Sequence, residues 1–399
     1  MLVVTALSLS LLLGLGDARG WWNHHGQPWD ENTSSGLADF ALGKVLSDAA
    51  PVFGPYKDVQ SNTSTWMDAY PDETLIVHMN LPGTHDAATW NYSAETQERN
   101  RPITDLAHII EYSSDWWRCQ NRSYIDMLND GIRVFDLRYA FDVTNTTLVF
   151  WHGPALQSQT ASVDDAMYGY YKWLDDHPSE AIFLSFQYQS NTQPYGTNNA
   201  AVQLALYRIL TSPAAKQYIK QDHTTGTLGD SRGKITLLRR FDLKNLPASY
   251  SAALPGLHFS PDDWTDNGAN ITLHYNDQND TAYIEDYYSP QTARGSSSEE
   301  NIRWKVNATE AHLNFAASDA HPDELFWSFA SSTNVLNGQT PVIQALGDGS
   351  STPLGGVNNQ LIPFLQGFHG KRLGIVMFDF YEVPAELLSL FLSLQPPPA

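Results

Sequence analysis

Short apolar runs recur along the chain from residue 75 onward, with longer mixed segments between them. The runs are continuous in apolar residues and do not alternate with polar ones, which is typical of strands buried on both faces of a parallel sheet. Each run is predicted to form such a strand. The runs cover residues 75–80, 132–138, 148–152, 181–187, 234–241, 325–331 and 372–380.

Helical periodicity fills several of the gaps between these runs, at residues 163–176, 200–219 and 357–366. Alternation of strands and helices indicates an α/β fold. Polar groups gathered at the carboxyl ends of so many strands favour a closed barrel over an open doubly wound sheet. We therefore expect a distorted TIM (β/α)8-type barrel in a single domain. No glycine-rich phosphate loop follows the first run, which disfavours a nucleotide-binding fold.

The two ends of the chain depart from this pattern. Residues 1–20 combine an apolar stretch of signal-peptide length with small residues after it, although the usual basic start is missing, and are predicted to be a secretory signal. Residues 21–73 are expected to form an N-terminal extension, mostly loops packed on the barrel, with one helix around residues 36–47. Residues 74–395 are expected to form the barrel. The last apolar run, residues 387–394, is too short to cross a membrane and is predicted to be the final helix.

Composition and sequons point to a secreted protein. Of the 399 residues, 42% are hydrophobic, which is enough for a large core. The lone Cys119 excludes an intramolecular disulfide, so stability must come from packing. We expect a secreted, extracellular glycoprotein that acts as a monomer. The sequons that support export are those of Asn32, Asn62, Asn91, Asn121, Asn145, Asn270, Asn279 and Asn307.

The chain carries a formal net charge of −21. At long range this charge repels polyanions, so we exclude nucleic acid as a partner and expect only transient contact with a membrane surface. Any phosphate group that binds must therefore meet local positive charge.

Two histidines and an arginine stand near the ends of predicted strands. His85 lies in LPGTHDAATW, and His152 closes the apolar part of LVFWHGP. Between them, GIRVFDLRY embeds Arg138 in an apolar strand. In a barrel the carboxyl ends of the strands meet at one mouth. We therefore expect the following residues to converge there: His85, Asp86, Arg138, His152, Arg240 and Asp379.

These residue types suit metal-free cleavage of a phosphodiester. One imidazole takes a proton from the attacking hydroxyl, the other gives a proton to the leaving oxygen, and a guanidinium holds the phosphate as charge builds up. A carboxylate beside an imidazole tunes its pKa for one of these tasks. When the attacking hydroxyl belongs to the substrate itself, proton transfer and charge stabilisation are the main tasks left to the protein.

Five segments resemble the successive motifs of the phosphatidylinositol-specific phospholipase C X-domain family: LPGTHD, GIRVFDLR, FWHGP, GKITLLRRF and GIVMFDF. The resemblance is to the bacterial-type, metal-independent branch and to secreted fungal phospholipase C-like phosphodiesterases, and it runs from about residue 75 to residue 380. It implies a distorted TIM barrel that cleaves an inositol phospholipid or a related phosphodiester through a cyclic phosphodiester. It also implies that the protein uses no metal ion and no cofactor.

The same resemblance implies roles for single residues. His85 corresponds to the general base, and Asp379 to the carboxylate that orients it. His152 corresponds to the general acid, and Asp86 to its partner carboxylate. Arg138 corresponds to the arginine that holds the phosphate, so that fixed positive charge stands where calcium-dependent relatives bind their metal.

The resemblance further implies a site for the headgroup. Arg240 matches the position that hydrogen-bonds inositol hydroxyls, and Asp286 and Tyr288 in YIEDYY correspond to an aspartate and a tyrosine that bind the sugar. One departure from the family pattern is Gln187, followed by Tyr188, where the family often has a lysine. This difference bears on headgroup specificity and not on the core reaction.

Two other functions fit parts of the sequence. Metal-dependent barrel phosphodiesterases of the glycerophosphodiesterase or sphingomyelinase D kind also have two histidines near strand ends. They need a cage of carboxylates, whereas Asp136 is here followed closely by the cation Arg138. A catalytically inactive barrel that binds a lipid headgroup is the second alternative, but it needs no acid and base around one phosphate. The expected partner in the leading interpretation is a phospholipid or an inositol-phosphate headgroup.

Overall fold

The computed structural model describes residues 33–397, so the predicted signal, residues 1–20, lies outside it. The chain divides into two compact units, Met1–Lys44 and Val45–Ala399, and every strand of the described residues belongs to the second unit. The first described element, helix α1 (Thr33–Phe53), extends beyond the predicted residues 36–47. Its last turn is fixed by burial, because Phe53 packs edge-on against Tyr170 with ring centroids 5.2 Å apart.

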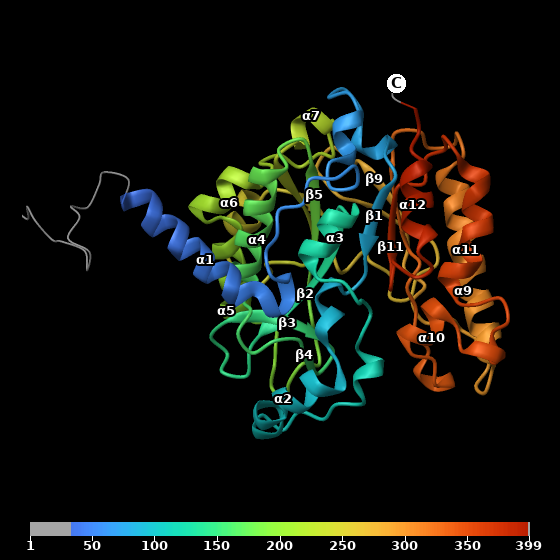
Figure 1. Ribbon diagram of the computed structural model, residues 1–399, viewed down its shortest axis with the longest axis horizontal. Helices are drawn as coiled ribbons and strands as arrows, with labels where there is room; N and C mark the ends of the chain where they lie inside the picture. The colour runs from blue at the N-terminus through green and yellow to red at the C-terminus, as the bar shows by residue number, and fades with distance from the viewer. Residues whose placement is uncertain (1–32, 398–399) are drawn as a thin grey trace, which may run out of the picture. The chain divides into compact units, whose positions relative to one another are not determined.

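The strands of the second unit form a curled sheet of mostly parallel strands (Figure 1). Neighbours follow the order β7-β6-β5-β2-β1-β11-β10-β9-β8, and only β8 runs antiparallel to its neighbour along this path. The end strands β7 and β8 are bridged by a backbone hydrogen bond from His258 N to Tyr275 O of 2.8 Å. This incompletely closed sheet confirms the expected distorted barrel. Its strands are β1 (Leu81–Thr84), β2 (Val134–Phe141), β5 (Ala181–Tyr188), β6 (Lys234–Arg240), β7 (Leu257–His258), β8 (Ile271–His274), β9 (Thr281–Glu285), β10 (Leu325–Phe329) and β11 (Ile375–Phe378).

Two of the predicted strands are wrong in part. The run 75–80 contains a 3₁₀ turn, η2 (Ile76–His78), and the strand begins only at Leu81. Gly83 then lets β1 approach β2 closely, because a Cβ at this position would lie 2.9 Å from Cβ of Val134. The run 148–152 is a strand, β3 (Leu148–His152), but it pairs antiparallel with β2 and with β4 (Ala155–Leu156). The cause is the tight turn at Asp142, because short turns join antiparallel strands only.

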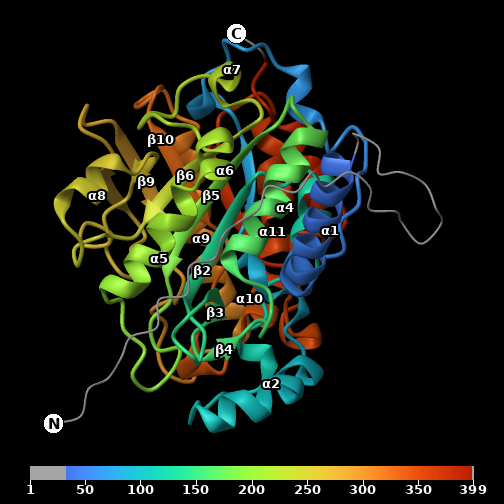
Figure 2. The same cartoon turned by 90° about the vertical axis from the view of Figure 1, so that its left-hand side faces the viewer.

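Helices surround the outside of the curled sheet, with α4, α5 and α6 to the left of it in Figure 1 and α9, α11 and α12 to the right (Figures 1 and 2). The helix predicted over 163–176 is confirmed as α4 (Val163–Asp176). The helix predicted over 200–219 is divided, because Pro213 starts a new helix after Ser212 caps it through a bond from Ala215 N to Ser212 Oγ of 3.1 Å. The final helix is confirmed as α12 (Glu386–Ser393).

The remaining helices complete the layers. The sequence pattern does not predict the long helix α9, which has few apolar residues on its exposed side. No helix among residues 33–397 is long and apolar enough to cross a membrane. The other bounds are α2 (Ala94–Leu106), α3 (Tyr124–Asp130), α5 (Ala200–Leu210), α6 (Pro213–Tyr218), α7 (Leu228–Ser231), α8 (Ala248–Ala253), α9 (Ser298–Ala316), α10 (Pro341–Leu346) and α11 (Val357–Leu365). Short 3₁₀ turns are η1 (Trp66–Ala69), η3 (Ala87–Asn91), η4 (Ser114–Trp116), η5 (Val335–Asn337), η6 (Gly349–Ser351) and η7 (Gln366–Phe368).

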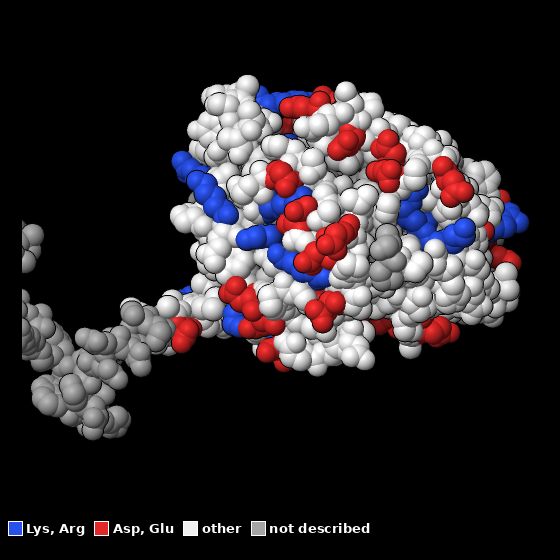
Figure 3. Space-filling model, turned by 90° about the horizontal axis from the view of Figure 1, so that it is seen from above, with Lys and Arg blue, Asp and Glu red and all other residues white. Residues whose placement is uncertain are grey.

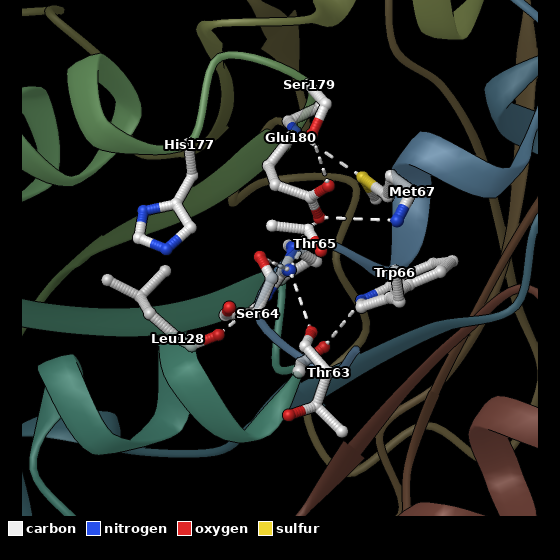
Figure 4. Close-up of polar contacts among 12 residues, drawn as sticks. Thr63, Ser64, Thr65, Trp66, Met67, Leu128, His177, Ser179 and Glu180 are labelled. Carbon is white, nitrogen blue, oxygen red and sulfur yellow. Dashed lines mark hydrogen bonds and ion pairs between the residues drawn. The ribbon is translucent and has the colours of Figure 1, made fainter. Parts of the chain in front are cut away.

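A buried ion pair anchors the segment that leads into the barrel. Arg133 and Glu180 are both fully buried and lie 2.5 Å apart. Arg133 also donates to the backbone oxygen of Ser64 at 2.9 Å, and Glu180 accepts from Met67 N at 3.4 Å. Figure 4 shows Glu180 facing the segment 63–67. Because each buried charge has a partner, the pair fixes this segment against β2 without leaving an unpaired ion in the core.

Acidic and basic side chains are mixed on the face at which α7 and the C-terminal residues lie (Figure 3). Arg232, directly after α7, pairs for example with Asp72 at 2.6 Å. The net negative charge of the chain is therefore not gathered into one acidic patch on this face.

Candidate active site

The eight residues predicted for the site come together at the carboxyl ends of the strands. They surround a cavity of about 500 Å³, and six of them line it: His85, Arg138, His152, Arg240, Asp286 and Tyr288. The other two, Asp86 and Asp379, are buried behind the histidines, with at most 1% of their surface exposed. The convergence that the strand-end positions predict is therefore present in the structure.

His85 and Asp379 meet because of the register of two strands. Thr84 of β1 pairs with Phe378 of β11, so the residues that follow them leave the sheet side by side. His85 N donates to Phe378 O at 3.1 Å, and its side-chain Nδ1 lies 2.9 Å from Oδ1 of Asp379. The backbone pairing of β1 with β11 therefore sets the position of His85 beside Asp379, and no flexible loop is involved.

Arg138 settles the tautomer of His85. Its Nη2 lies 2.7 Å from Nε2 of His85. A guanidinium only donates hydrogen bonds, so Nε2 must be the acceptor, and Nδ1 carries the proton that it donates to Asp379. Burial, and secondly the charge of Arg138, hold the pKa of His85 well below its usual value. Burial raises the pKa of Asp379.

Two carboxylates orient Arg138. Asp136 stands two residues earlier on β2, on the same face of the strand, and its Oδ2 accepts from Arg138 Nε at 3.0 Å. Asp86 Oδ2 lies 3.4 Å from Nη1 of the same guanidinium. Burial lowers the pKa of Arg138, but the charges of Asp136 and Asp86 outweigh this effect and raise it. Arg138 is therefore a fixed cation, held at the cavity wall.

His152, at the end of β3, is the second imidazole of the cavity. Its ring centroid lies 6.3 Å from that of His85. Nδ1 donates to the backbone oxygen of Trp117 at 2.8 Å, which leaves Nε2 as its other functional nitrogen. Asp86 Oδ2 is 3.2 Å from Nδ1. However, neither carboxylate oxygen of Asp86 has a hydrogen-bond partner among the described residues, so the predicted partner carboxylate lies beside His152 without a hydrogen bond to it. Burial, more than the charge of Arg138, lowers the pKa of His152 to about 3.

The segment 117–120 connects the two histidines and is not predicted by the sequence. Besides the contact of Trp117 with His152, Cys119 Sγ lies 3.9 Å from His152 Nδ1. Gln120 is fully buried, and its Nε2 donates to the backbone oxygens of His85 at 2.8 Å and of Phe378 at 2.9 Å. The available signal is a run of aromatic and polar residues, WWRCQ, with no motif around it.

The predicted headgroup residues form a second cluster in the cavity. Arg240 Nη2 donates to Asp286 Oδ2 at 3.2 Å, and the guanidinium lies 3.9 Å from the ring centroid of Trp264. Trp264 Nε1 donates to the same carboxylate oxygen at 2.9 Å. Tyr288 donates to Asp266 Oδ1 at 2.9 Å. The sequence predicts Arg240, Asp286 and Tyr288 but not the aromatic wall that Trp264 supplies.

No protein-family model matches the sequence, but two known proteins resemble it in sequence. The 1-phosphatidylinositol phosphodiesterase of Staphylococcus aureus strain Newman is 21% identical over 274 residues, which are 68% of this chain and 76% of that relative. The protein of the same name from Listeria monocytogenes serovar 1/2a is 25% identical over 229 residues, which are 55% of this chain and 63% of that relative.

Solved structures of two such enzymes have the same fold. A phosphatidylinositol-specific phospholipase C of S. aureus superposes with a TM-score of 0.62 and 17% identity, and the match covers 84% of this chain and 97% of that one. The Listeria monocytogenes enzyme superposes with a TM-score of 0.52 and 21% identity over 83% of this chain and 97% of that one. The chain therefore has the fold of bacterial phosphatidylinositol-specific phospholipases C and resembles such enzymes in sequence.

The cavity has an amide side chain between two arginines. Gln187 on β5 pairs in register with Arg138 of β2 on one side and with Arg240 of β6 on the other. Gln187 lines the cavity, and its Oε1 is buried without a hydrogen-bond partner among the described residues. A lysine at position 187 would place a third cation between Arg138 and Arg240, whereas the amide of Gln187 offers an acceptor as well as donors.

The phospholipase C-like site also contains two groups whose donor atoms lie within 4.8 Å of one another, His85 with Cys119 and Asp379, and Asp86 with Cys119 and His152. Both groups depend on Cys119, and burial raises the pKa of this thiol well above its usual value. Arg138 lies beside both groups and would repel a cation. The donor set therefore suits a metal ion poorly.

Proposed function

We propose that this protein is a secreted phosphodiesterase that cleaves an inositol phospholipid or a related phosphodiester by attack of a neighbouring hydroxyl on the phosphate. One observation carries the proposal: two partly buried imidazoles with ring centroids 6.3 Å apart share a cavity with Arg138, a cation 2.7 Å from one of them. The relatives named 1-phosphatidylinositol phosphodiesterase support the substrate class.

His85 is the proposed general base. In its neutral form the proton is on Nδ1, toward Asp379, and the lone pair of Nε2 faces the cavity. It takes the proton of the inositol hydroxyl next to the phosphate, and the oxygen then attacks phosphorus to form a cyclic phosphodiester. The imidazolium that forms is stabilised by the buried carboxylate of Asp379.

His152 is the proposed general acid. Its Nδ1 proton is occupied by Trp117 O, so the proton for the leaving diacylglycerol oxygen must be on Nε2. Before substrate binds, burial disfavours this second proton, because it holds the pKa of His152 at about 3. A bound phosphate anion raises the pKa of His152, so that binding of the substrate favours the protonated form that acts as the acid.

Arg138 is the proposed phosphate clamp. Asp136 and Asp86 hold two sides of its guanidinium, and Nη2 points at His85, where the phosphate would bind. A guanidinium presents paired donors that match two phosphate oxygens, so this role needs no metal ion. For the headgroup, Arg240 and Asp286 are the proposed partners of inositol hydroxyls, and the aromatic side chains around them pack on the ring.

An apolar rim surrounds the cavity and supports transient contact with a membrane. Tyr112, Trp116 and Trp117 line one side of the mouth, and Val335 of η5 lines another. Tyr112 is 67% exposed, Val335 is 65% exposed and the neighbouring Leu336 is 76% exposed. Because the protein is acidic overall, we propose that it meets lipid through these apolar side chains and not through basic ones. The S. aureus phospholipase C also binds membranes.

Export, glycosylation and a monomeric state complete the proposal. The asparagines of six sequons are exposed on the described surface, as glycan attachment requires: Asn62, Asn121, Asn145, Asn270, Asn279 and Asn307. The sequon of Asn32 and the predicted signal lie outside the described residues.

The test is cleavage of phosphatidylinositol vesicles in excess EDTA, followed by phosphorus NMR of the products. We expect a cyclic inositol phosphate at the same rate with and without chelator. A matched pair of variants, His85→Ala in the cavity and His369→Ala on the surface, should differ, with turnover lost only in the first. Activity that EDTA abolishes would support the metal-dependent alternative, and binding of vesicles without product would support the inactive one.

A further inference from the structure

A second polar cavity lies where the barrel is least closed. It has a volume of about 490 Å³, and its walls include Arg239 of β6, His258 of β7 and His274 of β8. This is the seam that the bond from His258 N to Tyr275 O bridges. None of the residues that line this cavity lines the catalytic one.

Arg239 is buried in this wall without an acidic partner. Successive residues of β6 point to opposite faces, so Arg240 enters the catalytic cavity while Arg239 faces the seam. Arg239 is 6% exposed. Its Nη1 donates to the backbone oxygens of Leu254 at 2.8 Å and Ser251 at 3.4 Å, at the end of α8. Its Nε is buried and has no acceptor among the described residues.

The other buried arginines are paired. Arg133 lies 2.5 Å from Glu180, and Arg240 lies 3.2 Å from Asp286. No carboxylate among residues 33–397 forms an ion pair with Arg239, so its charge is uncompensated there. Burial accordingly lowers the pKa of Arg239 to about 10, although the more distant Asp242 acts in the opposite direction. A buried guanidinium without a counter-charge is costly unless an anion joins it.

Three imidazoles surround the same space. His223 Nδ1 donates to Gly256 O at 3.1 Å, which leaves its Nε2 for another contact. His258 Nε2 is held by Asp242 Oδ1 at 2.8 Å, and His274 is exposed at the mouth. The carboxylate that also lines the cavity, Asp277, is exposed to solvent. Donors of this kind around a guanidinium match the oxygens of a tetrahedral oxyanion.

We propose that the seam cavity is a phosphate-binding site, separate from the catalytic one, in which Arg239 and the imidazoles of His223 and His274 hold a phosphate group that is free or carried by a small organic molecule. Bound phosphate supplies the counter-charge that Arg239 lacks. It also links β6 to β8 across the seam and therefore stabilises the closed barrel.

The experiment is NMR of the full chain with ¹³Cε1-labelled histidine, titrated separately with inorganic phosphate and with glycerol 1-phosphate. Single His→Gln variants assign the signals of His223, His258 and His274, and the signal of His152 reports the catalytic cavity. We expect saturable shifts of the three seam signals. Tighter binding of the ester would identify an organic phosphate as the ligand, and equal binding would identify free phosphate.

Variants separate this site from the proposed catalytic function. Arg239→Gln should weaken phosphate binding at the seam at least about tenfold, because a hydrogen-bonded charge is lost, while the response of His152 stays unchanged. His223→Gln, at an exposed position, should also weaken phosphate binding at the seam. This variant tests the proposal if Arg239→Gln does not fold. The exposed His369→Gln is the matched control and should change nothing. Seam signals that do not move with phosphate, or that move equally in wild type and His223→Gln, would overturn the proposal.

Discussion

Arg138 donates a hydrogen bond from Nη2 to Nε2 of His85 across 2.7 Å. This bond holds the imidazole in the tautomer that a base needs, with its proton on Nδ1, 2.9 Å from Asp379. It also occupies the lone pair that must receive the proton. A substrate phosphate must therefore compete with His85 for the Nη2 donor of Arg138 as it binds, and Nε2 of the base becomes free only when the phosphate is in place.

Arg138→Gln tests this coupling through the pH dependence of kcat/KM. The pKa of His85 is lowered first by burial and then by the charge of Arg138. Removal of the guanidinium removes the second cause, so the pKa rises and the acid limb of the profile moves to higher pH. Turnover should also fall about 10²- to 10³-fold, because a donor to the transition state is lost. The exposed Arg101→Gln should leave the profile unchanged. A shift toward lower pH would contradict the coupling.

Leaving-group dependence separates the two histidines. His152→Ala should reduce cleavage of phosphatidylinositol about 10²- to 10⁴-fold, because the alkoxide must then leave without a proton. With an inositol phosphodiester of p-nitrophenol, which leaves readily as an anion, the same variant should lose little. His85→Ala should lose activity with both substrates, because the nucleophile is the same. Equal losses of His152→Ala with both substrates would argue against its role as the acid.

Asp86→Asn should alter how stability depends on pH. Burial raises the pKa of Asp86 from 3.8 to about 8, with a smaller opposing effect of Arg138. The folded state thus binds this proton more tightly than the unfolded state, so wild type loses stability as pH rises between these two values. The free energy of unfolding of the variant minus that of wild type should therefore increase by up to about 1.4 kcal/mol per pH unit over this range. Urea unfolding from pH 5 to pH 8 measures the difference, and parallel curves for the two proteins would contradict it.

Local sequence predicts the barrel where the strands are buried on both faces. The strands β5 and β6 begin and end within one residue of the predicted runs, because parallel strands carry an uninterrupted apolar pattern. Local sequence does not predict which strands pair or in which direction, because this depends on the loop that connects them. The run 148–152 has the composition of a barrel strand, but the turn at Asp142 folds it back onto β2 as a hairpin.

The residues of the site likewise include some that local sequence predicts and some that only the fold brings into place. His85, Arg138 and Asp379 are predictable because strand ends follow from the apolar pattern and strand ends meet at one mouth. The partner of His152 is not predictable, since every residue has a carbonyl and only the fold decides that the one of Trp117 faces Nδ1. Gln120 is missed for a related reason, because its targets are two backbone oxygens from strands remote in sequence.

Gln120→Met tests whether the segment 117–120 positions the base. The change removes hydrogen bonds to the backbone oxygens of His85 and Phe378 and should cost about 2–4 kcal/mol of stability. It should also lower kcat more than it raises KM, because substrate contacts remain while His85 shifts. Asn80→Leu is the matched control. Asn80 is equally buried and bonds the oxygens of Lys371 and Leu394 away from the cavity, so its loss should destabilise the protein without changing kcat of the folded enzyme.

The apolar rim can be tested apart from the chemistry. Val335→Ser combined with Leu336→Ser removes two exposed apolar side chains, 65% and 76% accessible, beside the cavity mouth. Each buried aliphatic side chain is worth about 1.5–3 kcal/mol on transfer from water, so binding to phosphatidylinositol vesicles should weaken by at least about tenfold. Hydrolysis of a soluble inositol phosphodiester should be unchanged. Trp304→Ser removes an apolar side chain that is 41% exposed on α9, does not line the cavity and should affect neither assay. Equal loss with soluble and vesicle substrates would mean that the rim acts on the catalytic residues and not on the lipid surface.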